Sequence, residues 1–174
     1  MVVQVSETVC IAPIRTIMFR PRVANVAAVT RNDKETTFEL DSHADTSVLG
    51  NGALIVADFN EPVNVQGYDP SLGIKTYRTI NGAVGYCDPL TGKIFNIVIH
   101  QAIYILTLDH HLLCPMQCCV AGVDINECPK FLTTFPQENS HCIIEKYEYG
   151  ARTLLRLALQ GVTSVLNVFK IAEA

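Results

Sequence analysis

The chain has 174 residues, of which 17% are charged, and its formal net charge is −4. This length suits a single domain that buries roughly two-thirds of the surface exposed by the unfolded chain. Abundant aliphatic residues argue against a disordered chain. Because no basic patch dominates, nucleic acid is not an expected partner. No stretch is long and apolar enough to span a bilayer as a helix, so a membrane is not an expected partner either.

Residues 1–21 are expected to form a poorly structured tail, and residues 22–172 a single domain. Pro13 and Pro21 interrupt the tail, whose polarity follows no clear period. Glu7 and several arginines break its apolar stretch, so we find no secretory signal; a mitochondrial transit peptide is a weaker alternative. Seven cysteines, an odd number, favour free and mostly buried thiols in a reduced, cytoplasmic setting.

The first predicted elements bring an acidic residue to the end of a strand. Residues 23–30 form a short β-compatible run, and Asn32-Asp33 is expected to be a turn. Alternation then predicts a strand that carries Thr36, Phe38 and Leu40 on one face and leads directly into Asp41.

A long hairpin is predicted next. Val63 and Val65 alternate in one strand, and residues 74–87 are expected to form the returning strand. Between them lies a turn-rich tip bounded by glycines. The tip consists of Gly67, Tyr68, Asp69, Pro70, Ser71, Leu72 and Gly73.

The remaining elements complete a mostly β chain with one short helix. A turn at 88–92 precedes a buried strand at 94–105. Pro115 suits the first position of a helix and Gly122 its C-terminal cap. Alternation resumes at Val123 and Ile125, residues 129–141 are expected to be an exposed loop, and a late strand carries Leu155, Leu157 and Leu159 into Gly161. The pattern predicts a small barrel or a folded sheet.

The segment from Asp41 to Thr46, D-S-H-A-D-T, carries the strongest chemical signal. An acidic residue, a hydroxyl and a small residue on a tight loop after a strand are what an aspartic peptidase builds around its reactive carboxylate. That chemistry needs two carboxylates sharing one proton, because two like charges a few ångströms apart cannot both ionise. The chain has one such loop, so a second copy would have to supply the other carboxylate. The alternative is that Asp41 is only a turn residue.

Three landmarks in order make the chain resemble the retropepsin-like aspartic proteases. They are E-L-D-S-H-A-D-T-S-V at 39–48, the glycine-bounded tip at 67–73, and H-H-L-L-C-P-M-Q at 110–117. Further short matches over residues 22–168 include P-V-N-V-Q-G-Y-D-P-S-L-G and L-Q-G-V-T-S. They are similar to the protease segment of polyproteins from long-terminal-repeat retrotransposons of algae, oomycetes and fungi.

The resemblance implies a small closed barrel, a homodimer and an extended polypeptide substrate, with no cofactor or metal. It implies a cytoplasmic site of action, within retroelement particles where these form. Asp41 matches the catalytic aspartate, and Ser42 the hydroxyl that bonds across the dimer beneath the two carboxylates. Ala44 and Asp45 match positions that line the substrate groove, Thr46 closes the loop, and 67–73 matches the flap.

Two residues depart from the family pattern, because His43 and Cys114 stand where it has glycine. Glycine permits close backbone approach and positive φ. A protonated imidazole beside Asp41 would favour the ionised carboxylate and either disturb proton sharing or change the working pH. These departures favour a second hypothesis, a catalytically inactive dimerisation or peptide-binding module.

Other interpretations stay open. The alternation of Asp41, His43 and Asp45 allows a metal-dependent hydrolase as a weaker alternative, although a loop at this position argues against a shared face. The cysteines at 114, 118, 119 and 128 fit a zinc site only loosely, and buried thiols are favoured. His110 and His111 are expected at the surface rather than as a pH-sensitive pair. Tyr68 suits substrate contact or ordinary surface equally, and the three leucines suit the core slightly better than a subunit interface.

Overall fold

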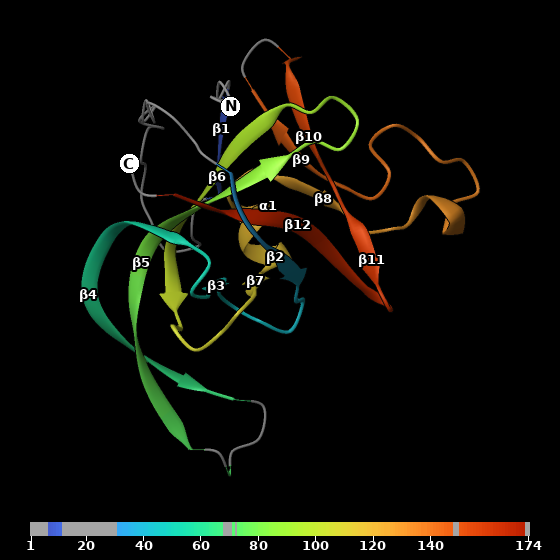
Figure 1. Ribbon diagram of the computed structural model, residues 1–174. Coiled ribbons are helices and arrows are strands. Elements are labelled where there is room, and N and C mark those ends of the chain that lie inside the picture. Colours follow the sequence, from blue (N-terminus) through green and yellow to red (C-terminus); the bar gives the residue numbers. More distant parts are fainter. Residues whose placement is uncertain (1–6, 12–30, 68–70, 72, 148–149, 173–174) are drawn as a thin grey trace.

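A computed structural model describes residues 7–11, 31–67, 71, 73–147 and 150–172 (Figure 1). Strands predominate and one short α-helix occurs among these residues, which confirms the mostly β class. In chain order the elements are β1 (Glu7–Ile11), β2 (Arg31–Leu40), β3 (Val48–Leu49), β4 (Leu54–Gln66), β5 (Ile74–Cys87), β6 (Ile94–Tyr104), β7 (His111–Leu113), α1 (Pro115–Val120), β8 (Asp124–Asn126), the 3₁₀ turn η2 (Lys130–Leu132), β9 (Cys142–Lys146), β10 (Arg152–Arg156), β11 (Ala158–Gln160) and β12 (Thr163–Ile171).

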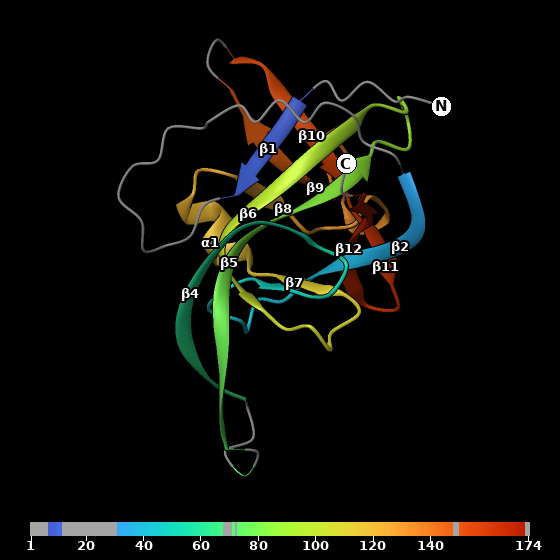
Figure 2. The same cartoon turned by 60° about the vertical axis from the view of Figure 1, so that its left-hand side comes forward.

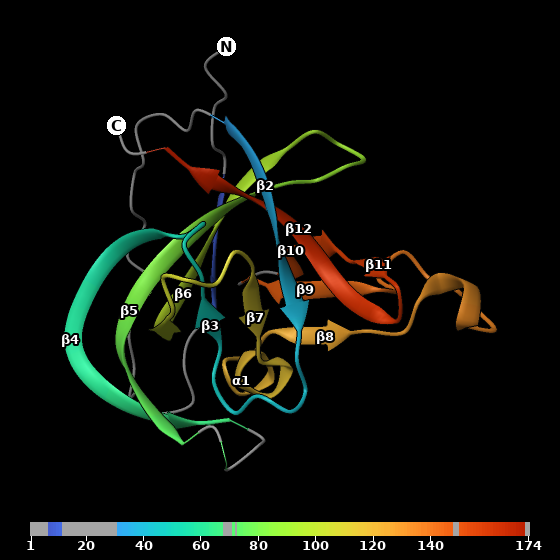
Figure 3. The same cartoon turned by 60° about the horizontal axis from the view of Figure 1, so that its bottom comes forward.

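Within the described residues, nine strands form one sheet and three form a smaller one. The large sheet has the order β1-β6-β3-β7-β2-β12-β5-β4, with β11 paired to β12. The strands β6, β3, β7, β2, β12 and β5 are paired in this order, and β5 also pairs with β6. The chain of pairings therefore returns to the strand from which it started. Figure 3 shows β3, β7 and β2 side by side, with α1 at their lower end.

The core lies inside this set of strands and follows the predicted alternation. Phe38 and Leu40 are buried on one face of β2, as expected from their spacing. Most of β6 is buried on both faces, which suits its run of β-branched residues. The main cluster joins residues of β2, β5, β6, β9 and β12, so residues far apart in the sequence share one core.

Helix α1 begins and ends where its sequence signals predict. Pro115 occupies the first helical turn, and the Cys114 thiol caps it by accepting a bond from the Gln117 N–H. At the other end Gly122 has φ of +86° and donates to the Cys119 carbonyl, while Val123 donates to the Cys118 carbonyl. This bonding pattern is the Schellman motif, which favours glycine because it needs positive φ.

The smaller sheet, β10-β9-β8, is joined to the large one through Tyr86 of β5. The Arg156 N–H donates to the Tyr86 hydroxyl oxygen at 2.8 Å. Burial raises the pKa of Tyr86 to about 12, so the hydroxyl remains protonated through the physiological range. The two sheets are therefore held together by a buried polar contact as well as by apolar packing.

The hairpin of β4 and β5 extends away from the body of the molecule (Figure 2). The returning strand has the predicted bounds, and the predicted tip lies between the two strands. Gly73 has φ of +70°, as a turn glycine allows. Tyr68, Asp69, Pro70 and Leu72 lie outside the described residues.

Several expectations are corrected. Asn32-Asp33 is not a turn: β2 runs through it, because Arg31 pairs with Ile171 of β12 rather than with a preceding strand. The late strand is two strands, β10 and β11, and Leu157 between them donates its N–H to the His141 carbonyl. The end of the 129–141 loop is buried at Ser140 and His141, and the His141 ring contacts the Ser164 hydroxyl of β12 at 3.1 Å.

The N-terminal region also differs from the expected tail in one place. Residues 7–11 form β1, which pairs in parallel with β6. The predicted run at 23–30 and the rest of the tail lie outside the described residues. Among the residues that the structure describes, no helix has the length and apolar character needed to cross a membrane.

Candidate functional site

Asp41 lies at the junction of two neighbouring parallel strands. It follows Leu40, the last residue of β2, and β2 pairs in parallel with β7 from Phe38–His111 to Leu40–Leu113. The Asp41 N–H donates to the Leu113 carbonyl at 3.0 Å and so continues this pairing by one residue. The side chain is 35% exposed, so its carboxylate is partly open to solvent or to a bound molecule.

The loop after Asp41 is held by the carboxylate itself. One oxygen, Oδ1, accepts the His43 N–H at 2.9 Å, and the Ala44 N–H donates to the Asp41 carbonyl at 3.3 Å. This is the local bonding by which aspartate favours turns. The His43 side chain is 93% exposed, and its Nδ1 lies 3.8 Å from Oδ1 of Asp41. The imidazole therefore stands beside the carboxylate without being packed against it.

The other predicted loop residues differ in their exposure. Ser42 and Asp45 are exposed, and Ala44 and Thr46 are half-buried. The chain thus brings all six residues from 41 to 46 together on one loop. Figures 1 and 3 show this loop and the β4–β5 hairpin at the same end of the molecule, with the hairpin extending past it.

The far end of the loop is fastened to α1 by a buried polar contact. Ser47 is fully buried; its N–H donates to Oε1 of Gln117 at 2.9 Å, and its Oγ accepts the Cys114 N–H at 3.1 Å. The Ser47 carbonyl accepts the Ile103 N–H of β6 at 3.1 Å. Buried polar groups with these partners fix the backbone, because losing one leaves a costly unpaired group.

His111 contacts the strand before the loop and the residue that follows β3. Its ring is fully buried, packs 4.8 Å from the Phe38 ring, and accepts the Gly50 N–H at Nδ1 at 3.0 Å. Burial, with a smaller effect of His110, lowers the pKa of His111 to about 4, so the ring is neutral at pH 7. The expectation that both histidines lie at the surface is wrong for His111, because β7 lies between β2 and β3.

Gly50 shows why the chain after the loop needs a glycine. A Cβ at this position would lie 2.3 Å from the His110 carbonyl oxygen and 2.4 Å from that of Leu108. Backbone atoms cannot move aside as the end of a flexible side chain can, so only glycine permits this approach. The strand β3 is held close to the segment before β7 for this reason.

The two departures from the family pattern introduce no backbone strain. Among the described residues, the non-glycine residues with positive φ are Asn60, Gln101 and His141. His43 is not one of them, and Cys114 has φ of −79° as the cap of α1. A side chain at either position therefore does not need the left-handed region that favours glycine. What His43 changes is the chemistry beside the carboxylate rather than the path of the chain.

The cysteines form no disulfide among the described residues and only partly fit the expected burial. Cys114, Cys118 and Cys142 are buried and Cys87 is half-buried, but Cys119 and Cys128 are exposed. The side chain of Cys10 is not described. Within the described residues no three His, Cys, Asp or Glu side chains gather closely enough to hold a metal ion. The metal-dependent alternative therefore has no support from these residues.

Sequence reasoning missed Ser47, Gln117 and the burial of His111. Ser47 directly follows the motif, and Gln117 lies in a six-residue helix, so neither stands out by composition or period. The one available signal was the position of Ser47 next to the apolar pair Val48-Leu49. A polar residue there is expected to be buried with its neighbours, and a buried polar group needs hydrogen-bond partners. The leucines divide as their burial shows: Leu155 and Leu157 are in the core, and Leu159 is 37% exposed.

Comparison of the chain with protein-family models, with curated proteins and with solved structures finds no match.

Proposed function

We propose that this chain is an aspartic endopeptidase of the retropepsin-like type, active as a homodimer on extended polypeptides. The observation that carries the proposal is the place of Asp41: a partly exposed carboxylate at the junction of β2 and β7, on a loop fixed by Ser47 and Gln117. The long hairpin at the same end of the molecule supports the assignment of a flap. The return of the strand pairings to β6 supports a small closed barrel.

In this mechanism two copies each supply Asp41 to a shared centre. One carboxylate is ionised and takes a proton from a water held between the two. The other is protonated and gives its proton to the oxygen of the scissile carbonyl. Proton transfers of this kind typically contribute roughly 10²–10⁴-fold to the rate. The exposed Ser42 is the candidate for the bond across the dimer, and closure of the hairpin would exclude water from the peptide.

The substrate follows from the shape of such a site. An extended peptide laid between a flap and the two active loops offers its backbone to Ala44, which is half-buried, and to Asp45, which is exposed. The resemblance to retrotransposon proteases makes the polyprotein of a retroelement the proposed natural substrate. The proposed place of action is the cytoplasm, including retroelement particles.

A second candidate function is a peptide-binding or dimerisation module without catalysis. His43 is the observation that favours it, because the imidazole lies 3.8 Å from Oδ1 of Asp41 and the same oxygen already accepts the His43 N–H. A carboxylate engaged in this way has less freedom to share a proton with a second carboxylate.

The two candidates are separated by one set of variants. The chain, its Asp41→Asn variant and an Asp124→Asn control are offered a peptide library at acidic and neutral pH. Asp124 is an exposed carboxylate on β8 that pairs with Lys146, so its loss leaves the loop at 41–46 intact. Cleavage by the chain and the control but not by Asp41→Asn is the expected result.

Oligomeric state completes the test. Sedimentation of the same samples is expected to show a dimer, and a pepstatin-type inhibitor is expected to bind it. A dimer that binds the inhibitor or peptides but cleaves nothing at any pH would support the inactive module. Equal cleavage by the chain and by Asp41→Asn, or a monomer that remains active, would refute the peptidase assignment.

A further inference from the structure

A cavity of about 450 Å³ is lined by residues between Pro89 and Leu159, none of which belongs to the loop at 41–46. It is formed where the turn after β5, the segment around η2 and the strands β9 and β10 meet. This volume is within the range of small-molecule sites, roughly 300–1,000 Å³. One part of its lining is apolar and open to solvent: Phe131 is 75% exposed and Leu159 is 37% exposed, with Leu157 and Pro89 beside them.

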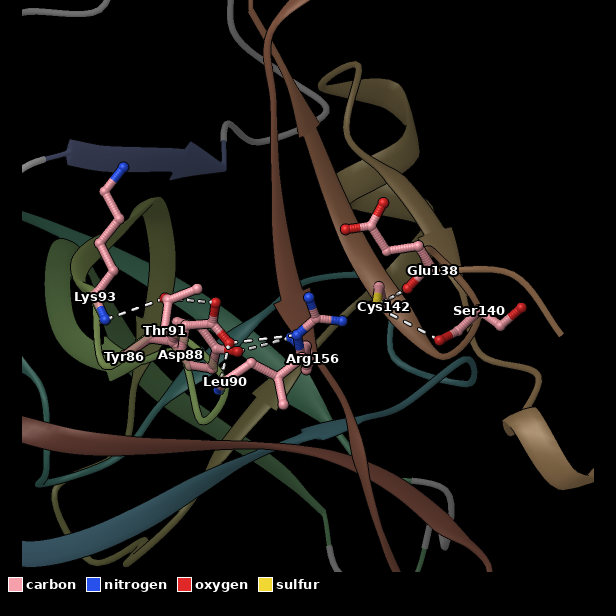
Figure 4. A network of polar contacts seen from close by, with 9 residues as sticks. All are labelled: Tyr86, Asp88, Leu90, Thr91, Lys93, Glu138, Ser140, Cys142 and Arg156. Atoms are coloured by element: carbon pink, nitrogen blue, oxygen red, sulfur yellow. Dashed lines mark hydrogen bonds and ion pairs between the residues drawn. The ribbon is translucent and has the colours of Figure 1, made fainter.

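The other part of the lining is polar and includes two cations. Arg156 is largely buried and anchored, because its Nε lies 3.3 Å from Oδ1 of Asp88, whose side chain is only 10% exposed. Asp88 is held in turn by the Leu90 N–H and the Thr91 hydroxyl. Figure 4 shows Arg156 between Asp88 on one side and Cys142 with Ser140 on the other. The guanidinium is thus fixed in place before any molecule binds.

Lys130 is the second cation in the lining of the cavity. Asp88 is neutralised by Arg156, and Glu138 by Arg152 at 3.3 Å. Among the described residues Lys130 has no carboxylate partner. His141 adds no charge at neutral pH, because burial lowers its pKa and Lys130 lowers it further.

The pKa of the Cys142 thiol shows which charges act on the wall of the cavity. Burial raises its pKa, Arg156 and Lys130 oppose the rise by favouring a negative charge at the sulfur, and the carboxylates of Asp88 and Glu138 add to the rise by smaller amounts. Both cations therefore act on the wall of the cavity. A chain with net charge −4 has here a local site that would attract a single negative charge.

We propose that this cavity binds a carboxylate attached to an apolar group. The carboxylate lies beside Lys130 and Arg156, and the apolar group packs against Phe131 and Leu157. Two sources supply this chemistry, a free organic acid or the C-terminal residue of a peptide that ends in an apolar side chain. The proposal does not depend on the peptidase assignment, because the cavity shares no residue with the loop at 41–46.

The test uses the full chain and two probes of matched shape. Isothermal titration calorimetry is performed with 4-phenylbutyrate and with its neutral amide, and with N-acetyl-Ala-Ala-Leu and its C-terminal amide. The acid of at least one pair is expected to bind about three- to tenfold more tightly than its amide, as one partly exposed ion pair allows. Amide chemical shifts of the ¹⁵N-labelled chain are expected to change around β9, β10 and η2.

Two variants locate the charge. Lys130→Gln is expected to remove most of the difference between acid and amide, and the matched control Lys75→Gln, an exposed lysine on the hairpin, is expected to leave it unchanged. Both lysines are exposed, so both variants should fold, which circular dichroism checks. Binding by only one acid identifies the source. Equal binding of acid and amide, no binding by either acid at millimolar concentration, shifts elsewhere, or an unchanged preference in Lys130→Gln would overturn the proposal.

Discussion

The buried ring of His111 is expected to limit the stability of this protein in acid. The ring accepts the Gly50 N–H and packs on Phe38, directly beneath the strand that ends at Asp41. Protonation would convert Nδ1 from an acceptor into a donor facing another donor, and would place a charge in the core. The informative change is His111→Gln, because glutamine is polar, is similar in size to histidine and does not titrate near neutral pH.

The magnitude follows from the pKa. Folding lowers the pKa of His111 from 6.5 to about 4, chiefly through burial. Below pH 6.5 the unfolded chain takes up a proton that the folded chain refuses, so the free energy of unfolding falls as the pH drops from 6.5 to 4. At about 1.4 kcal/mol for each unit of pKa, the upper limit is about 3–4 kcal/mol, and we expect a loss of about 1–3 kcal/mol.

Urea unfolding followed by circular dichroism, at half-unit steps from pH 4 to pH 8, measures this loss. The difference in unfolding free energy between the chain and His111→Gln is expected to change by that amount between pH 6.5 and pH 4. Gln160→Ala, a change at an exposed position without a titrating side chain, is the control and should give a difference that does not depend on pH. A pH-independent difference for His111→Gln would refute the reasoning, because the ring would then not resist protonation.

Three further changes test buried contacts elsewhere in the fold and beside the loop at 41–46. Glu145 has a buried oxygen without a hydrogen-bond partner, and burial raises its pKa to about 7. The free energy of unfolding should therefore fall as the pH rises from 4.5 to 7, and Glu145→Gln should remove that fall in urea titrations. Gln117→Leu should cost about 1–3 kcal/mol and speed hydrogen exchange at the Ser47 amide, which loses its acceptor. Gly85→Ala places a Cβ 2.3 Å from the Phe169 ring and should cost about 1–3 kcal/mol, partly recovered in urea unfolding of the double variant with Phe169→Leu.

Each of these has a result that contradicts it. For Glu145, a fall in stability between pH 4.5 and pH 7 that persists in Glu145→Gln would argue against this side chain as its cause. Unchanged protection of the Ser47 amide would mean that the Gln117 contact does not hold the loop. Strict additivity of the Gly85 and Phe169 changes would mean that the two side chains do not clash.

The candidate site shows where local sequence is sufficient. Asp41 was placed at a strand end because Phe38 and Leu40 alternate before it, and that alternation depends only on the two-residue period of a strand. The loop residues 42–46 come with it because they are neighbours in the chain. The supports of the loop were not predicted, since Gln117 reaches Ser47 across 70 residues and no local pattern records such a contact.

By itself, the sequence determined the elements whose causes are local: the buried strand β6, the hairpin ended by Gly73, and a helix begun by Pro115 and closed by Gly122. Only the tertiary structure decided that Asn32-Asp33 continues a strand and that His111 is buried. In both cases the partner comes from a distant part of the chain, β12 for the first and β2 and β3 for the second. Hydrogen-bond pairing between distant strands outweighs a turn preference of a few tenths to about 1 kcal/mol, and it leaves no mark within a short window of sequence.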